Sequence, residues 1–227
     1  PAEDKKSFVI SFASAYALAH SGEPVVVTYD AVLTEDAGLN FDANDNTAKL
    51  TYTNDPNGET NEIEDKTYTY TFGIDANLFG SNGAGWNKFT EELLKTGEVR
   101  RIDLGNGEYE ETTRLPGAEF TLTRKDGKAY TTVSDKNGYL SFTGLDAGEY
   151  TLQETKAPDG YSLNDAQIPV VISAEYNTDG TLKNYVIKVN NVETSTYTAT
   201  YDANEKGKIT DIKVEPGHDN AWSDVSD

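Results

Sequence analysis

The chain lacks cysteine and methionine altogether, and it has only two histidines among its 227 residues. Without cysteine, a disulfide framework, a thiolate metal site and a cysteine nucleophile are all excluded. The two histidines, His20 and His218, lie at opposite ends of the sequence, so no pattern of residues proposes a Ser-His-Asp site. Because the chain begins at Pro1 with neither an initiator methionine nor a signal peptide, we expect it to be a processed or excised piece of a longer protein.

Positive charge and long apolar runs are also scarce. The chain carries 39 Asp and Glu residues against 19 Lys and Arg residues, a formal net charge of −20. Such a charge repels phosphate backbones and anionic lipids, so we expect neither nucleic acid nor a membrane surface as a partner. No apolar run approaches the roughly 18 residues of a membrane span. Disorder is excluded as well, because 36% hydrophobic and 11% aromatic residues suffice for a core.

What the chain does have is an alternation of apolar and polar residues, rich in threonine and tyrosine. Apolar residues recur at every second position, for example at Tyr68, Tyr70 and Phe72, which is typical of strands rather than helices. Further alternating stretches follow from Pro116 onwards at spacings of about ten residues, separated by Asp-, Asn- and Gly-rich turns. The predicted strands lie within residues 8–12, 25–33, 50–52, 68–74, 120–122, 139–142, 150–152, 168–172, 185–189, 197–201 and 209–214. This pattern predicts an all-β chain built of β-sandwiches.

One stretch has helical rather than strand spacing. Trp86, Phe89 and Leu93 recur at intervals of three and four, and Gly97 supplies a stop, which predicts a short helix over residues 86–96. The Gly- and Ser-rich residues 80–85 precede it and favour a domain boundary nearby. We therefore predict two domains, 1–76 and 77–227, with an insertion over 79–111 in the second. A helix inserted in an all-β chain most often covers a sheet edge or a seam between domains, and less often binds a partner.

The acidic composition calls for a check on calcium. Asp42, Asn44 and Asn46 place oxygen atoms at positions 1, 3 and 5 of an EF-hand-like loop. However, Thr47 stands where that loop requires glycine, and Thr53 stands where it requires glutamate. We interpret this segment as a solvated turn, and we expect neither a metal ion nor a cofactor.

The most informative segment spans residues 149–161. If it is a strand, Tyr150, Leu152 and Glu154 share one face, so Glu154 points into the core when its two neighbours do. A buried carboxylate is costly unless it is paired or protonated. The alternative is a glutamate at the end of a strand that escapes to solvent just before the turn.

Three motifs resemble the collagen-adhesin B-type (Cna-B) domains of Gram-positive pilins and surface adhesins. Their sequences are LPGAEFTL at 115–122, GLDAGEY at 144–150 and LQETKAPDGY at 152–161. They occur in the family's order and spacing, and the resemblance covers residues 112–190. Residues 24–33, 50–56 and 68–74 are similar to the pilin domain that precedes a Cna-B domain. The resemblance implies two Ig-like sandwiches in tandem, the first of them partial.

The resemblance also implies a spontaneous isopeptide bond, formed when a buried lysine amine attacks an asparagine side chain. Glu154 matches the acid that shuttles protons in this family, and Asn54 matches the acceptor of the preceding domain. Strand parity agrees for Asn54, which shares a face with Leu50 and Tyr52. By the same parity Asn191 follows an apolar face and is the acceptor candidate of the second domain.

The family's reactive lysine is harder to place. Two registers put Leu78 or Arg101 at its position, and an arginine stays protonated and cannot act as the nucleophile. Lys88 or Lys95 can substitute only if the inserted segment folds inward. In the first domain, the strands that would carry the lysine are expected before Pro1. We therefore predict at most one intact isopeptide bond in this chain.

The leading hypothesis is a structural, non-enzymatic one. The chain would be part of a Gram-positive cell-surface pilus subunit or adhesin stalk, located outside the cell. Its expected partners are neighbouring pilin subunits and, through sortase acting on the full-length protein, the cell wall. The alternative is an adhesin module that contacts a host extracellular protein or glycan through Trp86 and Trp222. A secreted enzyme is the least favoured hypothesis, because the sequence shows no cluster of catalytic residues.

Overall fold

The computed structural model describes residues 6–53, 58–74 and 93–217, and it divides into two compact units. The first unit is Pro1–Leu33, in which every described residue is exposed. The regular element among those residues is the six-residue helix α1, Ser14–Ala19. The strands expected at 8–12 and 25–33 form no ladder there, although the rings of Phe8 and Tyr29 meet edge to face at 5.1 Å. These residues make no inter-strand hydrogen bonds, so they do not form β-strands.

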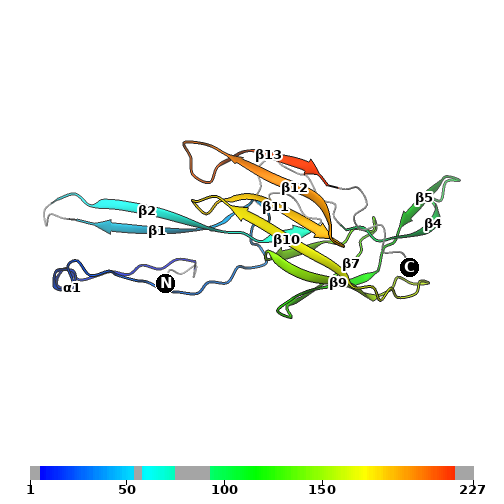
Figure 1. The fold of residues 1–227 in the computed structure, drawn as a ribbon, viewed down its shortest axis with the longest axis horizontal. Coiled ribbons are helices and arrows are strands. Elements are labelled where there is room, and N and C mark those ends of the chain that lie inside the picture. Colours follow the sequence, from blue (N-terminus) through cyan, green and yellow to red (C-terminus); the bar gives the residue numbers. More distant parts are fainter. Residues whose placement is uncertain (1–5, 54–57, 75–92, 218–227) are drawn as a thin grey trace. The chain divides into compact units, whose positions relative to one another are not determined.

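The second unit is Thr34–Asp227 and is all-β in its described residues (Figure 1). Its largest sheet has seven antiparallel strands in the order β13-β12-β11-β10-β9-β6-β7. These strands are β6 (Glu119–Arg124), β7 (Ala129–Val133), β9 (Gly148–Lys156), β10 (Ile168–Tyr176), β11 (Leu182–Val189), β12 (Val192–Tyr201) and β13 (Ile209–Pro216). The all-β prediction is therefore confirmed, and the predicted strands from Pro116 onwards correspond to members of this sheet, with one exception. The strand predicted at 139–142 overlaps only the first residue of β8 (Phe142–Leu145), which belongs to another sheet.

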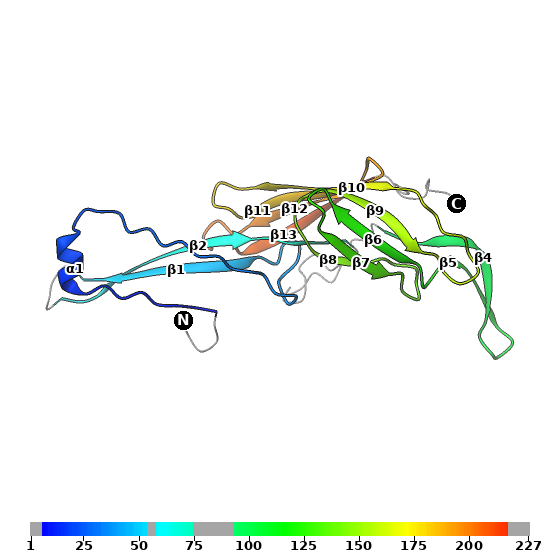
Figure 2. The ribbon, with the colours of Figure 1, turned by 90° about the horizontal axis from the view of Figure 1, so that it is seen from below.

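Three two-stranded sheets complete the described part of the unit: β1 with β2, β3 with β8, and β4 with β5. Their strands are β1 (Asn44–Tyr52), β2 (Asn61–Thr69), β3 (Phe72–Ile74), β4 (Thr96–Asp103), β5 (Tyr109–Arg114) and β8 (Phe142–Leu145). Figure 2 shows β4 and β5 projecting as a hairpin beyond the ends of β6 and β9. Among the described residues no helix is long and apolar enough to cross a membrane.

The core lies between the large sheet and the β3-β8 pair. Period-two alternation places one face of each strand inside, as in β9, where Tyr150, Leu152 and Glu154 are buried. From the other side, Phe72 and Ile74 of β3 are fully buried in the same cluster. The core therefore joins residues on both sides of position 76. The two-domain division at 76/77 and the tandem count stay predictions.

The predicted helix over 86–96 differs from the structure in its last residues, while 86–92 and the Gly- and Ser-rich residues 80–85 lie outside the described residues. Residues 93–95 are extended, Leu94 forms a bridge with Tyr139, and β4 begins at Thr96. The backbone N–H of Lys95 donates to the Gly138 carbonyl at 2.8 Å. Pairing with neighbouring segments satisfies these backbone groups, so the helical spacing does not decide the conformation of residues 93–95.

Candidate cross-link site

Glu154 lies on the inward face of β9, next to the end of the sheet. Its neighbours on that face are Tyr150 and Leu152, and only 2% of its surface is exposed. Strand β9 lies between β10 and β6. Glu154 itself pairs with Phe120 of β6, and the ladder between β9 and β10 ends two residues earlier, at Leu152. The inward orientation agrees with the alternation in the sequence. The alternative prediction, that the Glu154 carboxylate points to solvent, is wrong.

Lys95 reaches the same place from the segment that precedes β4. Its N–H donates to Gly138 and its carbonyl accepts the N–H of Leu115 at 3.0 Å, so the residue is held in an extended strand-like conformation. The side chain is 11% exposed. Leu93, two residues earlier, is also buried, which puts the two side chains on the inward face at period two.

The two side chains meet inside the sandwich. Lys95 Nζ lies 3.3 Å from Glu154 Oε1, and Nζ also lies 6.0 Å from the centre of the Phe120 ring. The other carboxylate oxygen, Oε2, accepts the backbone N–H of Asn164 at 2.9 Å. Oε1 has no hydrogen bond of acceptable geometry to any described residue, so its contact with the amine is purely electrostatic.

Burial makes this pair chemically useful. A buried ammonium and carboxylate each lose the hydration that stabilises their charge, and transfer of one proton converts them into a neutral amine and a neutral acid. A neutral amine is a nucleophile, and a protonated carboxyl can donate to a neighbouring carbonyl oxygen. The pair therefore holds both groups that amide formation requires, apart from the acceptor.

Lys95 lies beside Glu154, whereas neither Leu78 nor Arg101, the two residues predicted at the family's lysine position, is seen there among the described residues. Leu78 lies outside the described residues. Arg101 is exposed on β4, where its guanidinium stacks on the Tyr109 ring at 3.7 Å, so it is not at the site. The condition set for Lys95, that its segment folds inward, is met. The inward pair Leu93 and Lys95 at period two is the signal that could have located it from the sequence.

Only one of the two acceptor candidates, Asn191, lies within the described residues, and it is not in contact with the pair. Asn54 lies outside the described residues. Asn191 is exposed in the two-residue turn between β11 and β12, where Asn190 and Asn191 both have positive φ angles of 52° and 63°. The expectation that Asn191 continues the inward face of β11 is therefore wrong, because the strand ends at Val189 and the backbone reverses. Trp86 and Trp222, the contact residues of the alternative hypothesis, also lie outside the described residues.

The register nevertheless puts this turn at the same end of the sheet as Glu154. The N–H of Asn190 donates to the Pro169 carbonyl at 2.8 Å, and Pro169 pairs with Thr151 of β9. Glu154 follows three residues later on β9. The Asn190-Asn191 turn is thus separated from the strand that carries Glu154 by β10 alone.

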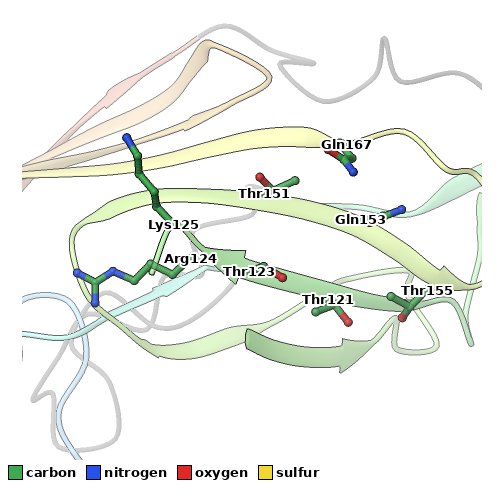
Figure 3. Close-up of a pocket in the computed structure, with 8 residues that line it drawn as sticks. All are labelled: Thr121, Thr123, Arg124, Lys125, Thr151, Gln153, Thr155 and Gln167. Carbon is green, nitrogen blue, oxygen red and sulfur yellow. The ribbon is translucent and has the colours of Figure 1, made fainter. Parts of the chain in front are cut away.

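The outer face of the same strands is chemically different. A depression of about 350 Å³ lies over β6, β9 and the residue before β10. Figure 3 shows the hydroxyl, amide and basic side chains that line it. The lining residues are Thr121, Thr123, Arg124, Lys125, Thr151, Gln153, Thr155 and Gln167. Arg124 and Lys125 are paired with Asp146 and Glu149 at 2.7 and 2.8 Å. We interpret this face as the solvated side of the sheet, the usual place for threonine on a strand.

Comparison with known proteins defines the class of the domain that carries Glu154. Residues 102–186 match the SpaA family, described as a prealbumin-like fold domain. This match covers Glu154 and agrees with the β-sandwich seen in the structure.

The chain as a whole is similar to a streptococcal surface protein. It is 29% identical over 195 residues to the trypsin-resistant surface T6 protein of Streptococcus pyogenes serotype M6. The match covers 84% of this chain and 31% of that protein, so the chain spans about a third of the length of this relative.

Two crystal structures of BcpA, the major pilin subunit of Bacillus cereus, are also similar over part of the chain. A variant of BcpA shares 27% identity over 40% of this chain and 39% of its own, with a TM-score of 0.25. BcpA itself shares 26% identity over 38% and 34% of the two chains, with a TM-score of 0.24. The family match and the streptococcal relative confirm the resemblance to Gram-positive pilus and surface proteins drawn from the sequence.

Proposed function

We propose that this chain is a structural segment of a Gram-positive pilus subunit or adhesin stalk, stabilised by an isopeptide bond that forms at Lys95. The observation that carries the proposal is the buried pair of Lys95 and Glu154 within 3.3 Å of each other, with Glu154 inside the region that matches the SpaA family. The similarity to a streptococcal surface protein supports the location outside the cell. Neighbouring subunits, and sortase acting on the full-length protein, are the partners that this function requires.

The proposed reaction is an intramolecular transamidation. Glu154 takes a proton from the Lys95 ammonium, and the neutral amine attacks the side-chain carbonyl carbon of an asparagine. The new Nζ–C bond forms and the C–NH2 bond breaks. The carboxyl of Glu154 gives its proton to the departing nitrogen, which leaves as ammonia. The carboxylate then takes the second proton of the former ammonium from the new amide nitrogen and releases it to solvent. The Asn164 N–H on Oε2 keeps the carboxyl oriented while Oε1 faces the amine.

A covalent link at this position suits a chain under tension. Lys95 precedes all seven strands of the largest sheet in sequence, and a link to one of these strands closes a long loop that pulling cannot extend. By analogy with disulfides, closing such a loop stabilises a domain by about 2–5 kcal/mol, mainly by restricting the unfolded chain. The streptococcal relative is named as trypsin-resistant, and we propose the same property for this chain.

Intact-protein mass spectrometry tests the proposal directly. The wild-type chain should weigh one ammonia less than its sequence, and Glu154→Gln and Lys95→Arg should both restore the full mass. Lys156→Arg is the matched control, because Lys156 lies on the same strand as Glu154 but is exposed, and it should keep the lower mass.

Peptide mapping of the same sample identifies the acceptor as a branched peptide joined to Lys95. A branch at Asn191 requires the β11–β12 turn to open, whereas a branch at Asn54 links Lys95 to the preceding domain. A wild-type mass equal to the sequence mass would remove the isopeptide bond from this chain while leaving the structural role standing.

A further inference from the structure

A second polar site lies at the base of the β4–β5 hairpin, where the chain forms a cleft of about 360 Å³ against the turn that follows β9. The cleft is bounded on the hairpin side by Arg100 and on the opposite side by the end of β9 and its turn. Its lining residues are Arg100, Leu115, Pro116, Gly117, Lys156, Pro158, Asp159 and Tyr161. None of them takes part in the Lys95–Glu154 contact.

The side chain of Arg100 is held in place, but one of its hydrogen-bond donors lacks an acceptor. One of its guanidinium nitrogens donates to the Arg114 carbonyl across the hairpin, and its backbone pairs opposite Thr112. Its Nε atom is buried and has no hydrogen-bond partner among the described residues. A buried N–H donor without a partner carries its full desolvation cost, so native structures rarely leave one without a protein, water or ligand acceptor.

The charge of the cleft is opposite to that of the chain. Arg100 and Lys156 contribute two positive charges, and Asp159 is the one acid among the lining residues, although the chain as a whole carries a net charge of −20. The remaining surface is formed by Leu115, Pro116, Pro158 and Tyr161 and is largely apolar. Leu115 is 1% exposed and therefore forms a rigid floor.

We propose that this cleft binds a carboxylate group. A carboxylate supplies the acceptor that the Nε–H of Arg100 lacks, and the planar guanidinium matches its geometry. Lys156 adds a second, exposed positive charge at the edge, and the apolar walls fit the short aliphatic body that carries a carboxylate. A phosphate, with its higher charge, is disfavoured by the negative field of the whole chain.

This inference goes beyond the proposed structural role, because it assigns a non-covalent binding site away from Lys95. The carboxylate can come from a free organic acid or from an Asp or Glu side chain of a protein. Both sources present the same carboxylate to Arg100. They differ in the rest of the ligand, which would contact the apolar walls and the rim of the cleft. A blocked amino acid therefore distinguishes them from a simple acid.

Titration of the uniformly ¹⁵N-labelled full chain tests the site by NMR. Sodium propionate is added at constant ionic strength while the Nε–H signal of Arg100 is followed, and N-acetyl-glutamate N-methylamide is titrated in a second series. We expect a saturable shift of this signal with both probes, and tighter binding of the blocked glutamate points to a protein side chain as the source. Sodium phosphate should bind more weakly.

Adjacent residues provide the matched variants. Arg100→Gln should weaken binding about tenfold or more, as expected for the loss of a hydrogen bond to a charged group. Arg101→Gln should leave binding unchanged, because Arg101 stacks on Tyr109 and does not line the cleft. Lys156→Gln, an exposed position that leaves the hairpin contacts intact, should weaken it by a smaller factor.

The proposal is overturned if the Arg100 signal shifts linearly without saturation, if phosphate binds as tightly as propionate, or if Arg101→Gln weakens binding as much as Arg100→Gln. Because Arg100→Gln can loosen the hairpin, Lys156→Gln provides an independent test, and unchanged affinity in that variant also overturns the proposal. If the wild-type chain binds the probes as expected but has the full sequence mass, the isopeptide bond is refuted and the carboxylate site is supported. The two proposals can therefore fail separately.

Discussion

Lys95 and Glu154 form a buried contact of 3.3 Å between Nζ and Oε1, although the whole β4–β5 hairpin separates the two residues in sequence. The hairpin leaves the sandwich just after Lys95 and the chain returns at Leu115, whose N–H bonds the Lys95 carbonyl. The inserted hairpin therefore leaves the inward-facing lysine at the edge of the core, where it faces the acid.

Removal of one member of this pair should be strongly destabilising. Lys95→Met leaves the Glu154 carboxylate buried without its counter-charge, and we expect a loss of about 3–5 kcal/mol in the free energy of unfolding. Adding Glu154→Leu should recover part of that loss, because the uncompensated charge is then gone. Lys125→Met removes an exposed ion pair with Glu149 and should change stability little. Urea denaturation of these variants and of Glu154→Leu alone measures the effects, and additive losses from the two buried substitutions would contradict the prediction.

Gly138 packs directly against the Lys95 backbone, so a side chain at this position should disturb the site. Its φ angle is +79°, and a Cβ atom would lie 2.5 Å from the Lys95 carbonyl oxygen. Gly138→Ala therefore combines backbone strain with displacement of the Lys95 backbone.

Gly127→Ala is the control for Gly138→Ala, because Gly127 also has a positive φ, +94°, but nothing lies within 4 Å of the Cβ position. We expect Gly127→Ala to cost about 1–2 kcal/mol from strain alone, and Gly138→Ala to cost at least about 1 kcal/mol more. Thermal unfolding followed by circular dichroism gives the comparison, and equal losses would argue against the close contact.

Alternation in the sequence was sufficient to locate most of the sheet, because each strand buries one face. In β9 the polar residues Thr151 and Gln153 face outward while Tyr150, Leu152 and Glu154 face inward, so even the buried acid followed from parity. The alternation gave a wrong prediction at Asn191, because it applies only within a strand and β11 ends at Val189. The Asn-Asn dipeptide carried the missing signal, since asparagine favours the positive φ angles of a two-residue hairpin turn.

The lysine was harder to place from the sequence for a different reason. Leu93 continues the helical spacing of Trp86 and Phe89, whereas Lys95 follows Leu93 at the period-two spacing of a strand. The tryptophan and phenylalanine before them favoured a helix. Tertiary pairing decides between the two, since Lys95 bonds to both Gly138 and Leu115, which are distant in sequence. Local spacing contains no information about these partners. The resemblance implied the kind of reaction, whereas the structure was needed to find which lysine lies beside Glu154.

Lys206, in the turn between β12 and β13, links this turn to strand β2. Its Nζ lies 3.4 Å from Asp65 Oδ1 and 3.2 Å from the Lys66 carbonyl oxygen, and it sits over the Tyr68 ring at 5.7 Å. Lys206→Ala should speed amide exchange in this part of β2 while changing global stability little, because exposed ion pairs contribute little to folding.

The control for this link is Lys208→Ala in the same turn, since Lys208 pairs with Glu205 at 2.7 Å rather than with β2. Hydrogen–deuterium exchange followed by mass spectrometry should show faster exchange over residues 61–69 for Lys206→Ala alone. Identical exchange in the two variants would mean that the turn does not hold β2.

Tyr150 should make the domain sensitive to alkaline pH. Burial in the core, reinforced by the nearby Tyr130, raises the pKa of Tyr150 from 10.0 to about 12, and its hydroxyl donates to the Asp146 carbonyl at 2.7 Å. Between these two pH values the unfolded chain has lost the tyrosine proton while the folded chain keeps it. Stability from this residue is therefore complete below about pH 10 and falls as the pH rises towards 12.

Tyr150→Phe should reduce this alkaline loss, at a cost of about 1 kcal/mol near neutral pH for the missing hydrogen bond. The slope should not vanish, because burial also raises the pKa of Tyr70, Tyr176 and Tyr201. Urea unfolding of the wild type and the variant at several pH values between about 9 and 12 compares the slopes. If the variant loses stability as steeply as the wild type, Tyr150 ionises equally in both states, and the buried hydroxyl does not control the alkaline limit.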